Sequence, residues 1–149
     1  MTTIVYRNGV MAGDRRAYGG DKTPIGSKKK IHRLADGTLF GVSSNNVGAD
    51  RLLRRWVEEG CPAVGPDYLK PDSFELLLIR ENGEVFFACN NLELTGPLEA
   101  EFYAIGSGSQ YALGAMSMGA GPERAAGIAA ELDIWSGDGI DALTLEPLK

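Results

Sequence analysis

Histidine and cysteine are scarce in this chain, and their scarcity excludes several kinds of site. The single histidine, His32, leaves no second imidazole for a multi-histidine metal site and makes Ser-His-Asp or Cys-His catalysis hard to build. Cys61 and Cys89 are too few for a disulfide scaffold and lack the spacing of a metal site. We therefore expect two reduced thiols, no bound metal and no other cofactor.

Long apolar runs and an excess of positive charge are also missing. The run Leu76-Leu77-Leu78-Ile79 is far shorter than the roughly 20 residues that cross a bilayer, and no signal peptide precedes the first expected strand. The net charge of −5 gives no basic surface of the kind that nucleic-acid binders show. We therefore expect a cytoplasmic protein that binds neither membrane nor nucleic acid. Its 149 residues, 44% of them hydrophobic, fit a single domain over residues 1–149.

Three dipeptides predict β-hairpins. Asn8-Gly9, Asp36-Gly37 and Asn82-Gly83 each separate β-favouring runs, and such pairs accept the positive φ angles of type I′ turns. The expected hairpins join residues 2–7 to 10–14, 29–34 to 38–44 and 74–80 to 84–89, and residues 102–106 and 139–145 are further expected strands. Hairpins of this kind build antiparallel sheets.

Three helices are expected in the remaining segments, over residues 49–59, over residues 109–118 and from Pro122 to Leu132. The second is expected to gather Tyr111, Ala115 and Met118 on one face, and the third to bury Ala125, Ile128, Ala129 and Leu132. Helices must cover sheet faces, so the pattern indicates an α+β fold of two stacked antiparallel sheets with helices outside. A simple two-layer α+β domain is the alternative.

The start of the chain carries a candidate for chemistry. Removal of Met1 makes Thr2 the N-terminal residue, whose hydroxyl then serves as nucleophile and whose own α-amine serves as base. Asp14 ends the strand paired with residues 2–7, so the Asn8-Gly9 turn brings it back beside Thr3. Strand alternation places Lys28 and Lys30 on one face and Lys29 on the other.

A series of short segments, in order, carries a family resemblance. They are Thr2-Thr3-Ile4-Val5, Arg7-Asn8-Gly9, Gly13-Asp14, Lys29-Lys30-Ile31-His32-Arg33-Leu34, Ala104-Ile105-Gly106-Ser107-Gly108, Tyr111-Ala112 and Asp133-Ile134-Trp135-Ser136-Gly137. Together they resemble the proteasome β-subunit and HslV-like superfamily of N-terminal nucleophile (Ntn) hydrolases, in a shortened form. The first hairpin is shorter than in the family by an even number of residues per strand, which keeps every side chain on its face.

The resemblance implies a four-layer αββα sandwich of two antiparallel sheets. One helix is expected to be missing, because the segment between Glu59 and Phe74 is short and its proline-rich sequence is typical of a loop. The resemblance also implies a threonine-type peptidase that acts on peptides or unfolded proteins. It implies a homo-oligomeric ring as well, with an ATP-dependent unfoldase as a further partner.

The family roles fall on six positions of this sequence. Thr2 resembles the nucleophile, Lys30 the cation beside it and Asp14 the carboxylate that pairs with the lysine. Ser107, Asp133 and Ser136 resemble the residues that hydrogen-bond around the threonine amine. The oxyanion donor is expected among the backbone N–H groups of Asn45, Asn46 and Val47, where the family usually has a glycine pair.

Each position also has a structural interpretation. Asp14 fits a loop aspartate, residues 28–30 fit a solvated basic run, and Ser107 fits the N-cap of a helix. Asp133 and Ser136 fit the end of a helix. Two further functions therefore stay open: an inactive, ring-forming structural subunit, and an Ntn amidase that acts on a small-molecule amide.

Overall fold

The Asn-Gly and Asp-Gly turns fold the chain into antiparallel hairpins, as predicted. The computed structural model describes residues 1–146. At the first turn Asn8 and Gly9 have φ angles of 49° and 80°, and Gly37 and Gly83 also have positive φ. The hairpins pair β1 (Ile4–Arg7) with β2 (Val10–Asp14), β5 (Ile31–Arg33) with β6 (Leu39–Ser43), and β7 (Glu75–Ile79) with β8 (Val85–Cys89).

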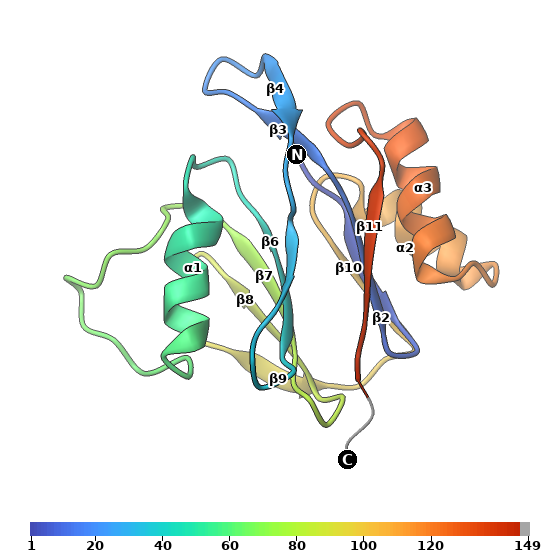
Figure 1. The fold of residues 1–149 in the computed structure, drawn as a ribbon. Coiled ribbons are helices and arrows are strands. Elements are labelled where there is room, and N and C mark those ends of the chain that lie inside the picture. The colour runs from blue at the N-terminus through green and yellow to red at the C-terminus, as the bar shows by residue number, and fades with distance from the viewer. Residues whose placement is uncertain (147–149) are drawn as a thin grey trace.

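Two antiparallel sheets pack face to face (Figure 1). One has the strand order β10-β1-β2-β11, with β10 at Phe102–Ile105 and β11 at Ile140–Thr144. The other has the order β5-β6-β7-β8-β9, with β9 at Thr95–Leu98. The layer between them consists of the buried side chains of Ile4, Tyr6, Met11, Ile31, Leu39, Leu77, Ile79, Val85 and Ile105. The sheets come very close beside the chain start, because a Cβ on Gly41 would lie 2.8 Å from the Ile4 side chain.

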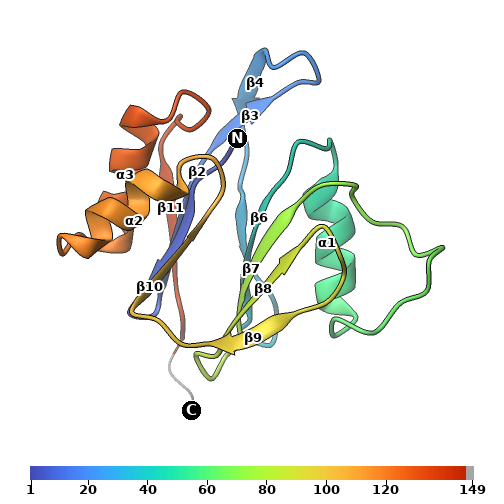
Figure 2. The same ribbon diagram turned by 180° about the vertical axis from the view of Figure 1, so that it is seen from behind.

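Three helices in residues 1–146 cover the outer faces of the two sheets (Figures 1 and 2). α1 (Ala49–Glu58) lies on the five-stranded sheet, and α2 (Ser109–Ser117) and α3 (Pro122–Leu132) lie together on the four-stranded sheet. Residues 59–74 form no helix, which confirms the expected loop. None of the helices that the structure describes is long and apolar enough to cross a bilayer.

The predicted faces of α2 and α3 were partly wrong. Met118 and Leu132 are 88% and 57% exposed, and Tyr111 is also exposed. Ala125 and Ala129 of α3 are buried as predicted, and Ala112, Met116 and Ala126 are buried beside them. Small side chains let these helices approach the strands closely, and Tyr111, Met118 and Leu132 lie on the outside.

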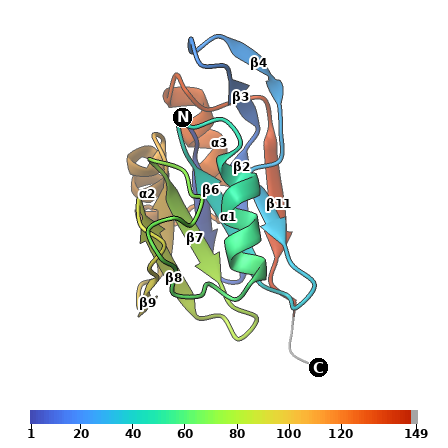
Figure 3. The same cartoon turned by 90° about the vertical axis from the view of Figure 1, so that its left-hand side faces the viewer.

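Three strands were not predicted. β3 (Arg16–Tyr18) and β4 (Pro24–Ser27) form a separate two-stranded sheet that projects beyond the main sheets (Figure 3). Every residue of β4 is exposed, so the strand carries no apolar alternation to detect. β9 contains Gly96 and Pro97, which are both unfavourable in strands. The proline is tolerated because β9 lies at the edge of the sheet, where its missing N–H costs no ladder hydrogen bond.

Candidate active site

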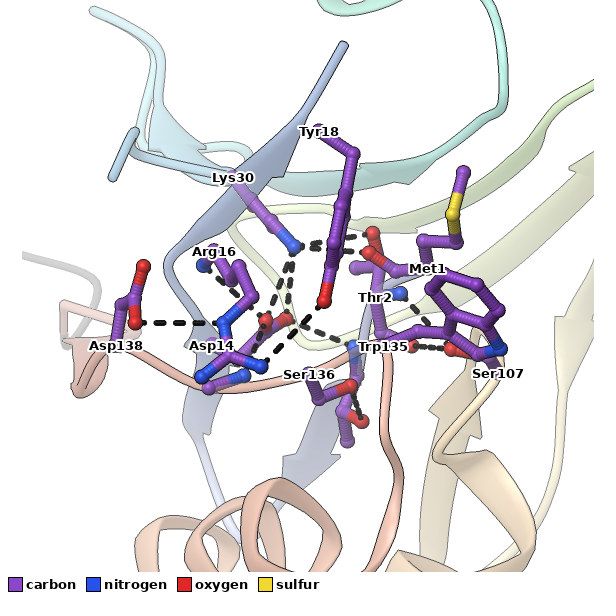
Figure 4. A network of polar contacts seen from close by, with 12 residues as sticks. Met1, Thr2, Asp14, Arg16, Tyr18, Lys30, Ser107, Trp135, Ser136 and Asp138 are labelled. Carbon is purple, nitrogen blue, oxygen red and sulfur yellow. Dashed lines mark hydrogen bonds and ion pairs between the residues drawn. The ribbon is translucent and has the colours of Figure 1, made fainter. Parts of the chain in front are cut away.

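Five segments distant in sequence meet at the start of β1 (Figure 4). Thr2 and Thr3 lead into β1 and are 4% and 0% exposed. Asp14 is the last residue of β2, and Lys30 directly precedes β5. The turn between β10 and α2 supplies Ser107, and the loop between α3 and β11 supplies Asp133 and Ser136. The structure thus brings together all six side chains to which the resemblance assigned roles.

A buried ion pair occupies the centre of the site. The Lys30 Nζ donates to both Asp14 carboxylate oxygens, at 3.1 and 3.0 Å, and both side chains are almost fully buried. The carboxylate also accepts backbone N–H groups from Thr3 at 2.9 Å and from Gly137 at 3.0 Å. These additional donors satisfy the carboxylate and hold it in one orientation, which a buried charge requires.

The same lysine contacts the chain start. Its Nζ lies 3.3 Å from Thr2 Oγ1 and 3.0 Å from the carbonyl oxygen of Met1. Burial lowers the pKa of Lys30 below its usual value, and the charge of Asp14 opposes that shift. A cation of reduced proton affinity therefore lies against the Thr2 hydroxyl.

A second polar chain reaches the nitrogen of Thr2. The Thr2 N–H donates to Ser107 Oγ at 3.1 Å, and Ser107 Oγ donates to Asp133 Oδ2 at 2.6 Å. Ser136 Oγ donates to the same carboxylate oxygen at 2.6 Å and lies 2.8 Å from Thr3 Oγ1. Thr2 is therefore held through its hydroxyl by one charged pair and through its nitrogen by another carboxylate.

Two glycines make room for the chain start. A Cβ on Gly106 would collide with the Thr2 backbone, and one on Gly108 would collide with Thr3 Oγ1. Gly106 also has a φ of +94°, a conformation that residues with a Cβ rarely adopt. The Gly-Ser-Gly sequence therefore lets Ser107 reach Thr2 while its neighbours pass close to β1.

Sequence reasoning missed the role of the β3–β4 sheet at this site. Tyr18 donates through its hydroxyl to the carbonyl oxygen of Ile134 at 3.0 Å, and its ring meets Trp135 edge-on at 5.5 Å. Arg16 Nε pairs with Asp138 at 3.3 Å. These contacts fasten the segment that carries Ser136 (Figure 4). Trp135, between Asp133 and Ser136, was the one feature of the sequence that could have indicated these contacts.

A cleft of about 340 Å³ opens beside Thr2, and its lining includes the three predicted oxyanion donors, Asn45, Asn46 and Val47. The N–H of Asn46 donates to Ser44 Oγ at 3.0 Å, and its side-chain oxygen accepts the Ser73 N–H at 3.0 Å. Asn46 thus holds the loop, and its N–H is already hydrogen-bonded. Asn45 and Val47 are therefore the stronger candidates for the oxyanion donor.

The electrostatics of the chain start favour a neutral amine. Burial lowers the pKa of the Met1 amine, and the nearby charge of Lys30 lowers it further, whereas Asp133 and Asp14 raise it. Within residues 1–146, no group of three or more His, Cys, Asp or Glu side chains is arranged to hold a metal ion.

Comparison with solved structures gives matches over almost the whole chain. Eukaryotic HslV from Trypanosoma brucei superposes with a TM-score of 0.72 over 97% of this chain and 98% of HslV, at 18% sequence identity. The chain has an HslV-like fold. BPH from Thiobacillus denitrificans matches with a TM-score of 0.66 at 22% identity, over 99% of both chains. The same protein in complex with epoxomicin gives a TM-score of 0.67 at 22% identity, over 98% of this chain and 99% of the other.

No family model matches the sequence, and no curated protein matches it. The structural matches confirm the HslV-like resemblance that the short segments of the sequence indicated.

Proposed function

We propose that this protein is a threonine-type peptidase whose nucleophile is Thr2, exposed by removal of Met1. The observation that supports it most strongly is the double constraint on Thr2. Its hydroxyl lies 3.3 Å from the Lys30 ammonium, and its nitrogen is hydrogen-bonded to Ser107. A residue that only begins a strand has no need of two buried polar networks, one at each of its reactive atoms.

In the proposed reaction, Thr2 supplies both the nucleophile and the base. Removal of Met1 turns the Thr2 N–H into a primary amine. The amine takes the proton from Oγ1 as that oxygen attacks a peptide carbonyl, and it then gives the proton to the departing amine of the substrate. The resulting ester is hydrolysed by water, with the same amine as base.

The neighbouring groups assist each step. The Lys30 cation stabilises negative charge that develops on Oγ1, and Asp14 holds the lysine in place. Ser107 and Asp133 orient the amine, and Ser136 braces the Asp133 carboxylate. A backbone N–H in residues 45–47 stabilises the oxyanion across the cleft.

The Met1-bearing chain is the inactive form under this proposal. The Thr2 nitrogen is then an amide, which cannot act as a base, and the Met1 carbonyl occupies a Lys30 hydrogen bond. Met1 also lines the cleft in which a substrate carbonyl would have to lie. Its removal supplies the base and opens the site in one step.

We further propose a homo-oligomeric ring that admits peptides or unfolded chains, with an ATP-dependent unfoldase as a partner. The support is the HslV-like fold, together with the helix–sheet–sheet–helix arrangement in Figure 1, which corresponds to a four-layer Ntn-hydrolase sandwich. In homo-oligomers, a heterologous (head-to-tail) interface generates a closed ring when its rotation closes. Sedimentation velocity of the purified protein tests the ring directly.

The test of the nucleophile is intact mass spectrometry before and after treatment with epoxomicin, the compound bound to BPH. We expect a mass without Met1 and a single adduct, absent from Thr2→Ala and retained in Thr3→Ser. Loss of Met1 without an adduct contradicts a competent threonine site. A retained Met1 without an adduct favours the structural subunit, and an adduct without peptide cleavage favours the small-molecule amidase.

A further inference from the structure

The cleft beside Thr2 has the opposite charge balance to the rest of the molecule. The chain carries 15 basic and 20 acidic side chains. The cleft lining nevertheless includes Arg16, Lys28, Lys30 and Arg51 against a single acidic side chain, Asp50, among the residues that the structure describes. A concave surface concentrates the field of the charges that line it, so the cleft is electropositive in an acidic protein.

The four cations differ in how firmly they are already paired. Lys30 is buried against Asp14, and Arg16 is held by Asp138 outside the cleft. Lys28 Nζ lies 3.2 Å from Asp50 Oδ1, in a pair whose side chains are 47% and 27% exposed. Arg51 is exposed and forms no ion pair with the residues in 1–146. Lys28 and Arg51 therefore face the solvent of the cleft with donors to spare.

We propose that this cleft selects peptides with an acidic side chain, Glu or Asp, on the residue whose carbonyl Thr2 attacks; this rests on the proposed peptidase function. An ammonium has three N–H donors, so Lys28 can bind a substrate carboxylate and still keep Asp50. Arg51 adds a planar group that binds carboxylates through two parallel hydrogen bonds. Thr2 lines the same cleft, so one bound residue presents both its side chain and its carbonyl.

The remaining lining and the size of the cleft suit such a side chain. Val42 and Ala49 are buried, and they give the cleft an apolar surface for the methylene groups of a glutamate. A volume of about 340 Å³ accommodates one side chain and adjacent backbone rather than an extended segment. A basic substrate side chain would instead have only Asp50 as a partner among the lining residues, and it would face the cations of Lys28 and Arg51.

The experiment uses the processed protein and four fluorogenic tetrapeptides that differ only at the residue before the cleaved bond: Glu, Gln, Leu or Lys. We expect kcat/KM for Glu to exceed that for Gln about 3- to 10-fold at low salt, as a partly exposed ion pair provides. The ratio of the two kcat/KM values should shrink in 0.5 M NaCl, because at about 0.5 M salt the interaction between exposed charges is screened beyond a few ångströms. Gln matches Glu in shape, so the ratio isolates the charge.

Two variants and a matched control locate the effect. Lys28→Gln and Arg51→Gln should each lower the Glu-to-Gln ratio toward one. Lys29→Gln makes the same change in charge on an exposed neighbour outside the cleft lining, and it should leave the ratio unchanged. Preference for Leu or Lys, or a ratio that Lys28→Gln and Arg51→Gln do not alter, overturns the proposal.

Failure of the proposed function gives a different result. If no peptide is cleaved and epoxomicin forms no adduct, the peptidase proposal fails. The charge preference is then decided by fluorescence anisotropy, with the labelled Glu and Gln peptides titrated into Thr2→Ala. Tighter binding of the Glu peptide that Lys28→Gln removes supports an acidic-peptide cleft, and equal binding overturns it.

Discussion

The two helical layers of this protein pack on their sheets in contrasting ways. α1 is held by large side chains, including Leu53 and Trp56 from the helix and Phe40 and Phe74 from beneath it, all at most 2% exposed. α2 and α3 are held mainly by alanines against Val5 and Ala12. The α1 side buries larger apolar side chains, whereas the α2–α3 side buries mainly small ones, which allow helix and strand backbones to approach closely.

This difference matches what each side contributes to the site. The close packing of α3 fixes Asp133, the first residue after the helix, at hydrogen-bonding distance from Ser107. α1 follows the loop of residues 45–48 and so supplies a wall of the cleft, without a direct bond to Thr2. We infer that the α2–α3 side sets the geometry of the reaction and that the α1 side mainly sets stability.

The largest effect is expected at the buried Lys30–Asp14 pair. Lys30→Met should lower kcat/KM by about 10³-fold, because it removes the cation at Thr2 Oγ1. It also leaves the fully buried Asp14 without its partner, which should cost about 3–5 kcal/mol of unfolding free energy. Peptide hydrolysis and urea unfolding measure the two losses.

The double variant Asp14→Asn/Lys30→Met separates these losses. With both charges of the pair removed, most of the stability should return while the activity stays lost. Recovery of activity in the double variant would argue that the pair is only structural.

Matched core substitutions test the division between the layers. Leu53→Ala should cost about 2–5 kcal/mol of stability, since it opens a cavity under α1, with kcat of the folded protein unchanged. Ala129→Leu should cost about 1–3 kcal/mol by overpacking and should also lower kcat, because it shifts α3 and Asp133. Equal effects of the two variants on kcat would break the comparison.

A pair of glycine substitutions tests how closely the α2–α3 side approaches the chain start. Gly108→Ala places a Cβ against Thr3 Oγ1 and should destabilise the protein by about 1–3 kcal/mol, with a loss of activity. Gly114→Ala lies inside α2, where a Cβ meets no atom within 4 Å. It should stabilise the protein by about 0.5–1 kcal/mol, since alanine favours helix. Thermal unfolding gives both signs in one experiment.

The smallest effect concerns pH. The amine acts as a base only when neutral, so kcat/KM should rise as pH passes through the amine pKa and fall in acid. Burial and the charge of Lys30 lower the pKa of the Met1 amine from its usual 8.0. The Thr2 amine of the processed chain has the same charged neighbours, so we expect its pKa, and with it the midpoint, to lie below 8.0 as well. Asp133 raises that pKa, and Asp133→Asn should therefore move the midpoint to still lower pH. A midpoint above pH 8.0 in the unaltered protein would contradict the amine as base.

The sequence predicted the elements whose signals are local. The Asn8-Gly9 turn fixed the register of β1 and β2, so Asp14 lies opposite the chain start, with its N–H donating to the Thr3 carbonyl at 3.1 Å. The helix that begins at Pro122 was likewise visible in the chain. The predicted strands agree with the observed ones to within a few residues at their ends.

Contacts between segments that lie far apart in the chain could not be predicted from the sequence. The docking of Tyr18 on Trp135 joins residues far apart in the chain, so the presence of Trp135 did not by itself reveal Tyr18 as its partner. The face of α2 that Tyr111 and Met118 mark in the sequence is exposed, and Ala112, which is buried, carries a weaker apolar signal than either of them. The Gly137 N–H bond to Asp14 likewise required the fold.

The most direct test of the account compares two forms of the same chain. One is released from a cleavable N-terminal fusion so that it begins at Thr2, and the other keeps Met1; both are assayed for peptide hydrolysis at equal concentration. We predict that the form beginning at Thr2 cleaves the peptides and that the Met1 form does not. Equal hydrolysis by the two forms, or none by the form that begins at Thr2, would contradict an N-terminal threonine nucleophile.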